Sequence, residues 1–289
     1  MFVFQEHVRQ TLRERLERLE QHFEADGMFF YGPIYPGVEK HFRDFVERMR
    51  TEPPDRHRLV IFLNTTGGSA ETVEALVDII RFNYSEVWFV VPDFAMSAGT
   101  IFCMSGDRIW MDYSSSLGPI DPQVHNGHDW VPALGYLDQV ERMIQRSIAG
   151  QLSDAELIML QSQDLAMLSR YEQARNLTIT LLKKWLVEYK FKDWVAHETN
   201  PEKRGQPVTA REKQERAEEI AKALADNRLW HSHGRRIGTS TLQNVLRLKI
   251  DDYSANVELR NQIRAYNDFL VEYIVREKLP MFLHSRSFF

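Results

Sequence analysis

Apolar residues in the first half of the chain follow two different spacings. The runs RLVIFLN (58–64) and SEVWFVVP (85–92) are apolar almost throughout, as is typical of strands with both faces covered. The segment 69–83 instead repeats apolar residues three and four positions apart, which predicts an amphipathic helix. Strand and helix patterns alternate in this way from about 28 to 135. The pattern predicts an α/β core with a mainly parallel sheet.

The segments around this core favour helices. An amphipathic pattern predicts a helix over about 5–25 that ends near Gly27. Strand signals almost vanish between 136 and 229, where a long helical pattern runs from about 164 to 193. Ser153 with Glu156, and Thr209 with Glu212, have the spacing of capping boxes that begin helices. We therefore expect four parts: an N-terminal helix (1–27), the α/β core (28–135), a helical region (136–229), and a return segment with a C-terminal helix (230–289).

Composition and charge narrow the class of protein. The 289 residues carry a formal net charge of -5, which gives no electrostatic reason to expect a nucleic-acid partner. The single cysteine, Cys103, excludes an internal disulfide. No apolar run approaches the roughly 20 residues that a membrane-spanning helix needs. The N-terminus also lacks the apolar core of a signal peptide, so we expect a cytoplasmic protein. His125 and His128 lack a third metal ligand at a workable spacing, and we expect no cofactor.

Two adjacent glycines, Gly67 and Gly68, separate the strand at 58–64 from the next helix. Backbone amides at such a turn are unpaired, and the helix dipole adds positive potential. The turn could therefore cradle a phosphate or stabilise an oxyanion. The two common phosphate-binding glycine motifs are absent, which weakens the first interpretation. An ordinary tight turn is the simplest alternative.

Ser97 has the equivalent position one β-α unit later, in FVVPDFAMSAGTIF (89–102). A helix is expected to begin after it, so the amides of Ser97 and Ala98 would be unpaired. The ordinary role for such a serine is an N-cap, worth about 1 kcal/mol to the helix. Consecutive β-α turns of a parallel sheet lie along one edge, however. If the two strands are neighbours, Gly67, Gly68, Ser97 and Ala98 could converge on one carbonyl oxygen.

Three segments carry a family resemblance: FLNTTGGSAETVEALVDIIR, VPDFAMSAGTIFCMSGDRIWMD and SSLGPIDPQV, in this order over about 58–124. Together they resemble the serine dehydrogenase proteinase family, which has the Clp protease and crotonase fold and is related to signal peptide peptidase A. The resemblance implies a core of repeated β-β-α units with additional helices at the N-terminus and in the second half. It implies that Ser97 is the nucleophile, Gly67 and Gly68 the oxyanion glycines, and Ala98 the second donor. Thr66 precedes the glycines where related sequences often have proline.

The general base is not fixed by the sequence. A serine at neutral pH needs a partner that accepts its proton. His233, in the segment WHSHGRRI (230–237) that also resembles the family, is the preferred candidate, with Asp121 orienting its ring. A surface histidine without a catalytic role is the alternative, and His231 also stays open. Signal peptide peptidase relatives use a Ser–Lys dyad, so Lys183 and Lys184 stay open too, although lysines are more often solvated.

Three functions fit these residues. The first is a serine peptidase that acts through a Ser97 acyl-enzyme, and it is the one we predict. The second is a crotonase-like enzyme acting on an acyl thioester, which would use the oxyanion glycines without needing Ser97. The third is a catalytically inactive scaffold subunit of the same fold. Relatives associate through helices outside the core, so we expect a homo-oligomer acting on a peptide or protein. No ATPase motif is present, so any unfolding would come from a separate ATPase or adaptor.

Overall fold

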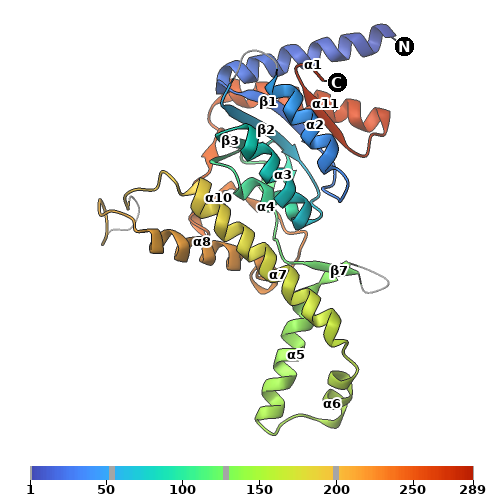
Figure 1. Cartoon of the computed structure of the whole chain (residues 1–289), viewed down its shortest axis with the longest axis vertical. Helices are drawn as coiled ribbons and strands as arrows, with labels where there is room; N and C mark the ends of the chain where they lie inside the picture. Colours follow the sequence, from blue (N-terminus) through green and yellow to red (C-terminus); the bar gives the residue numbers. More distant parts are fainter. Residues whose placement is uncertain (1, 52–55, 126–129, 198–201, 289) are drawn as a thin grey trace.

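A six-stranded sheet forms the core of the body, in the upper part of Figure 1. The computed structural model describes residues 2–51, 56–125, 130–197 and 202–288. The strand order is β10-β5-β3-β2-β1-β11, and all neighbours pair in parallel except β11, which is antiparallel to β1. The strands are β1 (Asp26–Tyr31), β2 (Arg58–Asn64), β3 (Glu86–Val91), β5 (Arg108–Met111), β10 (Asp251–Asp252) and β11 (Phe282–Ser285). The prediction of an α/β core with a mainly parallel sheet is confirmed.

Helices cover both faces of this sheet, which explains why its central strands β2 and β3 are apolar almost throughout. In β2, Leu59 and Ile61 belong to one buried cluster, whereas Val60 and Phe62 belong to the other. The second cluster is closed by α1 (Phe2–Phe23) and α11 (Val257–Glu277). The first is closed mainly by α2 (Glu39–Arg50), α3 (Ala70–Asn83), α4 (Ala98–Met104), α7 (Leu165–Trp185) and α8 (Ala210–Ala225). Successive side chains of a strand point to opposite faces, so a strand covered on both sides needs apolar residues at every position.

An arm projects from this body (Figure 1). It consists of residues 133–174, which form α5 (Ala133–Ile148), α6 (Asp154–Gln161) and the first half of α7. The capping box predicted at Ser153 and Glu156 begins α6, and an equivalent box at Thr209 and Glu212 begins α8. The hairpin of β7 (Gln123–His125) and β8 (Trp130–Pro132) joins the body to α5.

A second, smaller sheet was not predicted. It consists of β4 (Phe94–Ala95), β6 (Ser116–Leu117) and β9 (Ile237–Gly238), in that order. Each strand has only two residues, which is too short for an alternating pattern to be recognisable in the sequence. α9 (Asn227–Trp230) and α10 (Thr239–Asn244) flank β9 along the chain.

Three boundaries differ from the predictions. The first helix ends at Phe23, and Glu24 adopts a left-handed conformation (φ 49°), so that Gly27 lies inside β1 and not at a helix end. The helix predicted over 164–193 ends at Trp185 and continues as a π-helical turn, Leu186–Lys190. The final strand, β11, follows a helix that was predicted to be the last element.

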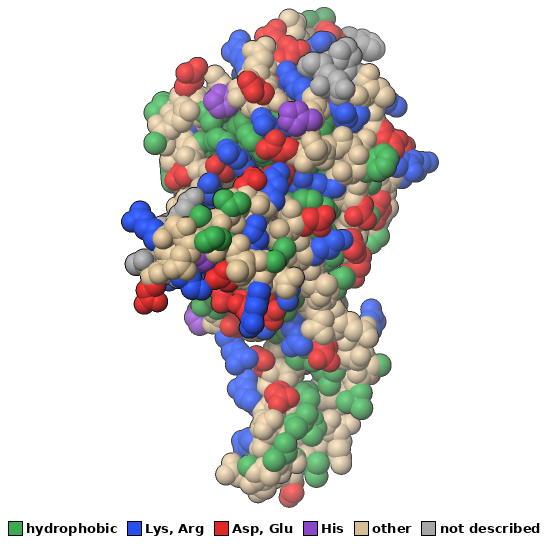
Figure 2. All heavy atoms as spheres, turned by 60° about the vertical axis from the view of Figure 1, so that its left-hand side comes forward, with side chains coloured by type: hydrophobic (Ala, Val, Ile, Leu, Met, Phe, Trp, Pro, Cys, Tyr) green, Lys and Arg blue, Asp and Glu red, His purple; other side chains and the backbone are tan. Residues whose placement is uncertain are grey.

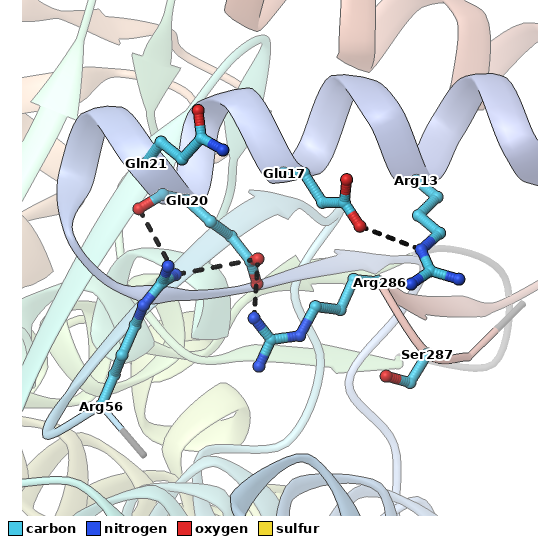
Figure 3. A pocket seen from close by; sticks show the side chains of 7 residues that line it. All are labelled: Arg13, Glu17, Glu20, Gln21, Arg56, Arg286 and Ser287. Carbon is cyan, nitrogen blue, oxygen red and sulfur yellow. Dashed lines mark hydrogen bonds and ion pairs between the residues drawn. The ribbon is translucent and has the colours of Figure 1, made fainter. Parts of the chain in front are cut away.

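An open hollow of about 440 Å³ lies at the amino-terminal edge of the parallel strands (Figure 3). Glu20 of α1 is buried there, with its carboxylate 3.2 Å from the Arg286 guanidinium and 3.7 Å from that of Arg56. Burial raises the pKa of Glu20 and of its neighbour Asp26, and the surrounding arginines partly offset that rise. Arg286 also pairs with Asp26 at 3.4 Å, so this cluster fastens α1 and β11 to β1. Within the part of the chain that the structure describes, no helix is both long and apolar enough to span a bilayer.

The π-helical turn generates a prediction about stability. Burial lowers the pKa of Lys190 to about 8, and the nearby Asp251 carboxylate only partly opposes this. The charged amine is therefore less stable in the folded than in the unfolded protein. The resulting penalty is full below about pH 8 and fades as the pH rises toward the unfolded-state value of 10.5. We expect Lys190→Met to raise the free energy of unfolding at pH 7 by about 1–3 kcal/mol.

Urea denaturation at pH 7 and pH 10 measures this effect, and the gain should be smaller at pH 10. Lys184→Met, at an exposed position of the preceding helix, is the matched control and should change the stability little. A less stable Lys190→Met protein at pH 7 would contradict the account.

Candidate active site

Ser97 lies on a sharp turn between β4 and α4. Its backbone angles are φ 53° and ψ -119°, a combination that non-glycine residues rarely adopt. Such strain costs on the order of 1–3 kcal/mol and persists only where neighbouring contacts enforce it. Here Gly99 N–H donates to Met96 O at 2.8 Å, and Thr100 N–H donates to Ser97 O at 2.9 Å. A strained strand-to-helix turn of this kind exposes the nucleophilic serine in α/β-hydrolases.

Ser69 precedes α3 and Ser97 precedes α4, and the two serines differ in their backbone conformation and in their capping hydrogen bonds. Ser69 caps α3 in the ordinary way: its backbone is extended (φ -83°), and its hydroxyl accepts a hydrogen bond from Thr72 N–H. Ser97 stands at the start of α4 but makes no capping hydrogen bond, and its side chain is partly exposed. Among the described residues, the Ser97 hydroxyl has no hydrogen-bond partner. The ordinary N-cap role considered for Ser97 is therefore wrong.

The glycine turn lies directly beside Ser97. β2 and β3 are parallel neighbours, and a bridge between Thr65 and Ala95 extends their proximity beyond the strand ends. A β-carbon on Gly67 would lie 2.6 Å from the β-carbon of Ser97, and the φ of Gly67 is +98°. Both the close approach and the backbone angle require glycine at position 67. The structure thus brings the two turns together.

The peptide between Gly67 and Gly68 has a defined orientation. Its carbonyl accepts a hydrogen bond from Ile34 N–H at 2.8 Å, and Ser69 N–H donates to Ile34 O at 2.8 Å. In a trans peptide the N–H points away from the C=O. The Gly68 N–H therefore points away from Ile34, toward the side on which residues 94–97 lie.

The amides of the two turns differ in their hydrogen bonding. Gly67 N–H donates to the Thr65 hydroxyl at 3.0 Å. In the described part of the chain, the amides of Gly68 and Ala98 have no such partner, and Gly68 is exposed. A β-carbon on Gly68 would lie only 1.8 Å from Ile34 O. Glycine is thus required for the close pairing that orients this amide.

Asp121 and His233, which lie far apart in the sequence, form a hydrogen-bonded pair. Asp121 Oδ1 is 2.9 Å from His233 Nδ1, and Asp121 Oδ2 accepts a hydrogen bond from Gln123 Nε2 at 2.7 Å. The Asp121 side chain is 1% exposed and that of His233 is 26% exposed. The buried carboxylate favours the tautomer with hydrogen on Nδ1. The His233 Nε2 atom is then available as a hydrogen-bond acceptor.

The small sheet brings these residues to one end. β4 is parallel to β6, so Ser97, just after β4, and Asp121, shortly after β6, lie at the same end of the sheet. β9 is antiparallel to β6, so His233, shortly before β9, lies at that end as well. Arg236 Nε donates to the Ser116 hydroxyl at 3.1 Å and holds the incoming segment against β6. No hydrogen bond joins Ser97 to His233 themselves; in many enzymes such a catalytic hydrogen bond tightens only in the complex with substrate.

The other candidates for the base have different environments. Lys183 Nζ is 2.7 Å from Glu218 of α8, and Lys184 is exposed. His231 is exposed and ends α9 in a left-handed conformation. His128 lies outside the described residues. Within the described ranges there is no group of three residues arranged as metal ligands.

Two residues of this region were missed from the sequence. Gln123 contacts the Asp121 carboxylate, and Thr100 joins α4 to the segment after β6. For Gln123 the sequence did contain a signal: it lies two residues after Asp121, and in an extended segment that spacing places both side chains on the same face. For Thr100 there was no signal beyond the motif itself, because its partners are backbone atoms distant in the sequence.

Solved structures of peptidases resemble this chain only in part. Two structures of the 1510-N membrane-bound stomatin-specific protease match with 19% and 16% identity and TM-scores of 0.32 and 0.35. They cover 41% and 56% of this chain and 61% and 59% of their own chains. A peptidase from Plasmodium falciparum matches with 21% identity and a TM-score of 0.29, over 32% of this chain and 60% of that chain.

Curated relatives and a family model complete the comparison. Two uncharacterized proteins of Methanocaldococcus jannaschii are each 26% identical, over 59% and 34% of this chain. The chain spans 55% and 34% of their lengths. The model of the ClpP-like SDH-type serine proteinase family matches residues 22–204, which include both turns and Asp121. Because this match spans well over half of the chain, the protein belongs to the ClpP-like SDH-type serine proteinase family.

Proposed function

We propose that this protein is a serine peptidase that cleaves peptide bonds through an acyl-enzyme on Ser97. The observation that carries the proposal is the pairing of His233 with the buried Asp121 carboxylate, at the end of the small sheet where the Ser97 turn lies. Membership of a serine proteinase family supports the same reaction. The unusual backbone of Ser97 adds support, because a serine that only capped a helix would have no need of it.

The proposed reaction begins with proton transfer. His233 Nε2 accepts the proton of the Ser97 hydroxyl as the oxygen attacks the substrate carbonyl carbon, and Asp121 holds the ring and stabilises its positive charge. The tetrahedral intermediate collapses when His233 gives the proton to the leaving amine. Water then attacks the ester carbonyl with His233 again as base, which releases the acid and restores Ser97.

The oxyanion is assigned to two backbone donors, Gly68 and Ala98. Gly68 N–H points to the side of the nucleophile turn, and Ala98 N–H begins α4. Gly67 is not assigned as a donor, because its N–H already donates to the Thr65 hydroxyl. Its role is to leave space for Ser97, since a β-carbon at position 67 would collide with that of Ser97. Such donors act on charge that develops in the transition state, and one of them is commonly worth about 10²–10³ in rate.

The alternatives receive less support. Lys183 is engaged by Glu218, and His231 lacks a carboxylate that would orient its ring among the described residues. A crotonase-like reaction would use the amides but would need neither a strained serine nor an Asp–His pair. An inactive scaffold would need neither the free amides, nor the strained serine, nor the Asp–His pair.

Labelling with a fluorophosphonate tests the nucleophile and the base. We expect the wild-type protein to be modified at Ser97, Ser97→Ala to be unmodified, and His233→Ala to react about 10²–10⁴-fold more slowly. Asp121→Asn should also slow the reaction strongly, because the amide favours the wrong tautomer of His233. Mass spectrometry of the labelled peptide identifies the site.

Lys183→Ala and His231→Ala are the matched controls for this experiment and should keep rates within about threefold of the wild type. Absence of labelling in the folded wild-type protein would overturn the proposal. A His233→Ala variant that reacts at the wild-type rate while Lys183→Ala does not would overturn the assignment of His233 as the base.

Substitution of Gly68 tests the oxyanion donors. A β-carbon at this position clashes with Ile34 O, so Gly68→Ala must turn or shift the peptide that carries the donor. We expect kcat for a peptide ester to fall about 10²-fold. Gly205→Ala is the control, because Gly205 also has a positive φ (+81°) but open space around its β-carbon position. A Gly68→Ala protein with an unchanged kcat would contradict the assignment.

We also propose that the protein assembles into a homo-oligomer through its arm. α6 has no buried residue, yet Leu157, Ile158 and Met159 follow one another in it and are 43%, 66% and 58% exposed. Leu165 and Ile148 nearby are each 76% exposed, and Figure 2 shows hydrophobic side chains gathered along the projecting part. Apolar helices of this kind are normally covered. Charges of both signs border the patch, as in the Arg146–Glu156 pair, so two identical surfaces could meet without net repulsion.

Light scattering tests this assembly. We expect the wild-type protein at micromolar concentration to have a mass of at least two chains, and Ile158→Asp with Leu165→Asp to lower it toward one chain. Both residues are exposed, so circular dichroism should show unchanged helix content. Val275→Asp changes an equally exposed residue of the body (64%) and should leave the mass unchanged. A wild-type mass of one chain would reject the proposal.

A further inference from the structure

The Thr100 hydroxyl connects three segments of the candidate active site. Thr100 lies in the first turn of α4 and is 0% exposed. Its Oγ1 is 2.9 Å from Ala95 O, 2.9 Å from Gly118 O and 2.9 Å from Gly118 N. A hydroxyl has one proton and can accept as well, so Oγ1 accepts from Gly118 N–H and donates to one of the two carbonyls at a time.

These contacts lie on both sides of Ser97 along the chain and beside it in space. Ala95 precedes Ser97 by two residues and Thr100 follows it by three, so a hydrogen bond from Thr100 to Ala95 O closes the strained turn from both sides. Gly118 directly follows β6 and leads to Asp121. A β-carbon on Gly118 would lie 2.6 Å from Met96 Cε, which shows how closely this segment passes the Ser97 turn.

The pattern differs from that of an ordinary helical threonine. Thr178 of α7 is also buried, and its hydroxyl donates to Ala174 O, four residues earlier in the same helix, at 3.0 Å. That arrangement is common and is local to one helix. The Thr100 hydroxyl instead reaches the strand before the turn and a segment 18 residues later. Its contacts therefore fix the relative position of separate elements.

We propose that Thr100 is a positioning residue for acyl transfer: it holds the Ser97 turn at a fixed distance from the segment that carries Asp121 and, through Asp121, His233. This inference rests on the proposed function. Thr100 does not touch the substrate, because its side chain is wholly buried. Its loss would misplace the nucleophile relative to the base without altering the surface that binds the peptide.

Thr100→Val removes the hydroxyl and keeps the shape of the side chain. Without the hydroxyl, the Ser97 turn should shift relative to the segment that carries Asp121. We expect this shift to lower kcat for a peptide ester, and the labelling rate of Ser97, by about 10²-fold. KM should change less than about threefold, because the peptide-binding surface is intact. Thr100→Ser restores the hydroxyl and should recover the rate to within about fivefold. Thr178→Val is the matched control, since it removes a buried hydroxyl elsewhere and should leave kcat unchanged.

The outcomes separate this inference from the proposed function. If the wild-type protein is labelled at Ser97 and Thr100→Val reacts at the same rate, the role of Thr100 is overturned and the peptidase proposal stands. If the wild-type protein is not labelled, the peptidase proposal fails, and the role of Thr100 in acyl transfer fails with it. If Thr100→Ser does not recover the rate, a positioning role for the hydroxyl is likewise rejected.

A second variant covers the case in which Thr100→Val does not fold. Gly118→Ala keeps the hydroxyl but introduces a β-carbon against Met96. The Met96 side chain can turn away from it, but the backbone Cα of Met96 would be only 3.3 Å away, so the two segments must also shift apart by a few tenths of an ångström. It should lower kcat with little effect on KM. A fully active Gly118→Ala protein would contradict the proposal.

Discussion

The candidate site depends on the parallel pairing of β2 with β3 and on its continuation past the ends of both strands. The Thr65–Ala95 bridge extends the pairing on one side of the glycine turn, and the Ile34–Gly68 bridge flanks the turn on the other side. Between the two bridges, the Gly67–Gly68 peptide has only one orientation that satisfies its carbonyl. The direction of the Gly68 N–H is therefore a consequence of sheet pairing. No side chain is needed to aim it.

The small sheet brings three distant segments of the candidate site together with very few residues. Two-residue strands contribute little stability, but β4, β6 and β9 fix which ends of three distant segments meet. The strand directions alone bring residues 97, 121 and 233 to one end of this sheet. The buried Thr100 hydroxyl and the Arg236–Ser116 contact then hold the segments in register. A site built in this way depends on backbone connections more than on the chemistry of neighbouring side chains.

The central strands β2 and β3 of the large sheet could be predicted from the sequence because they are covered on both faces and are therefore apolar almost throughout. The edge strands β10 and β11 could not, because they are short and contain polar residues. Capping boxes at Ser153 and Thr209 likewise marked helix starts that the structure contains. The small sheet could not be predicted, because two-residue strands leave no periodicity. The hydrogen bonding of the site was also beyond the sequence: that Gly67 donates to Thr65 while Gly68 remains exposed depends on the path of the backbone. The pairing of Asp121 with His233 was expected from family resemblance and not from any spacing, since 112 residues separate them.

A crystal structure of the protein with a peptide aldehyde or boronate bound to Ser97 would test the central claim most directly. The account predicts a covalent bond to the Ser97 oxygen, with the oxyanion 2.7–3.1 Å from the backbone nitrogens of Gly68 and Ala98. It also predicts His233 Nε2 within hydrogen-bond reach of the adduct while Nδ1 stays on Asp121. An adduct whose oxyanion faces solvent, or a His233 ring turned away from Ser97 with a lysine in its place, would contradict it.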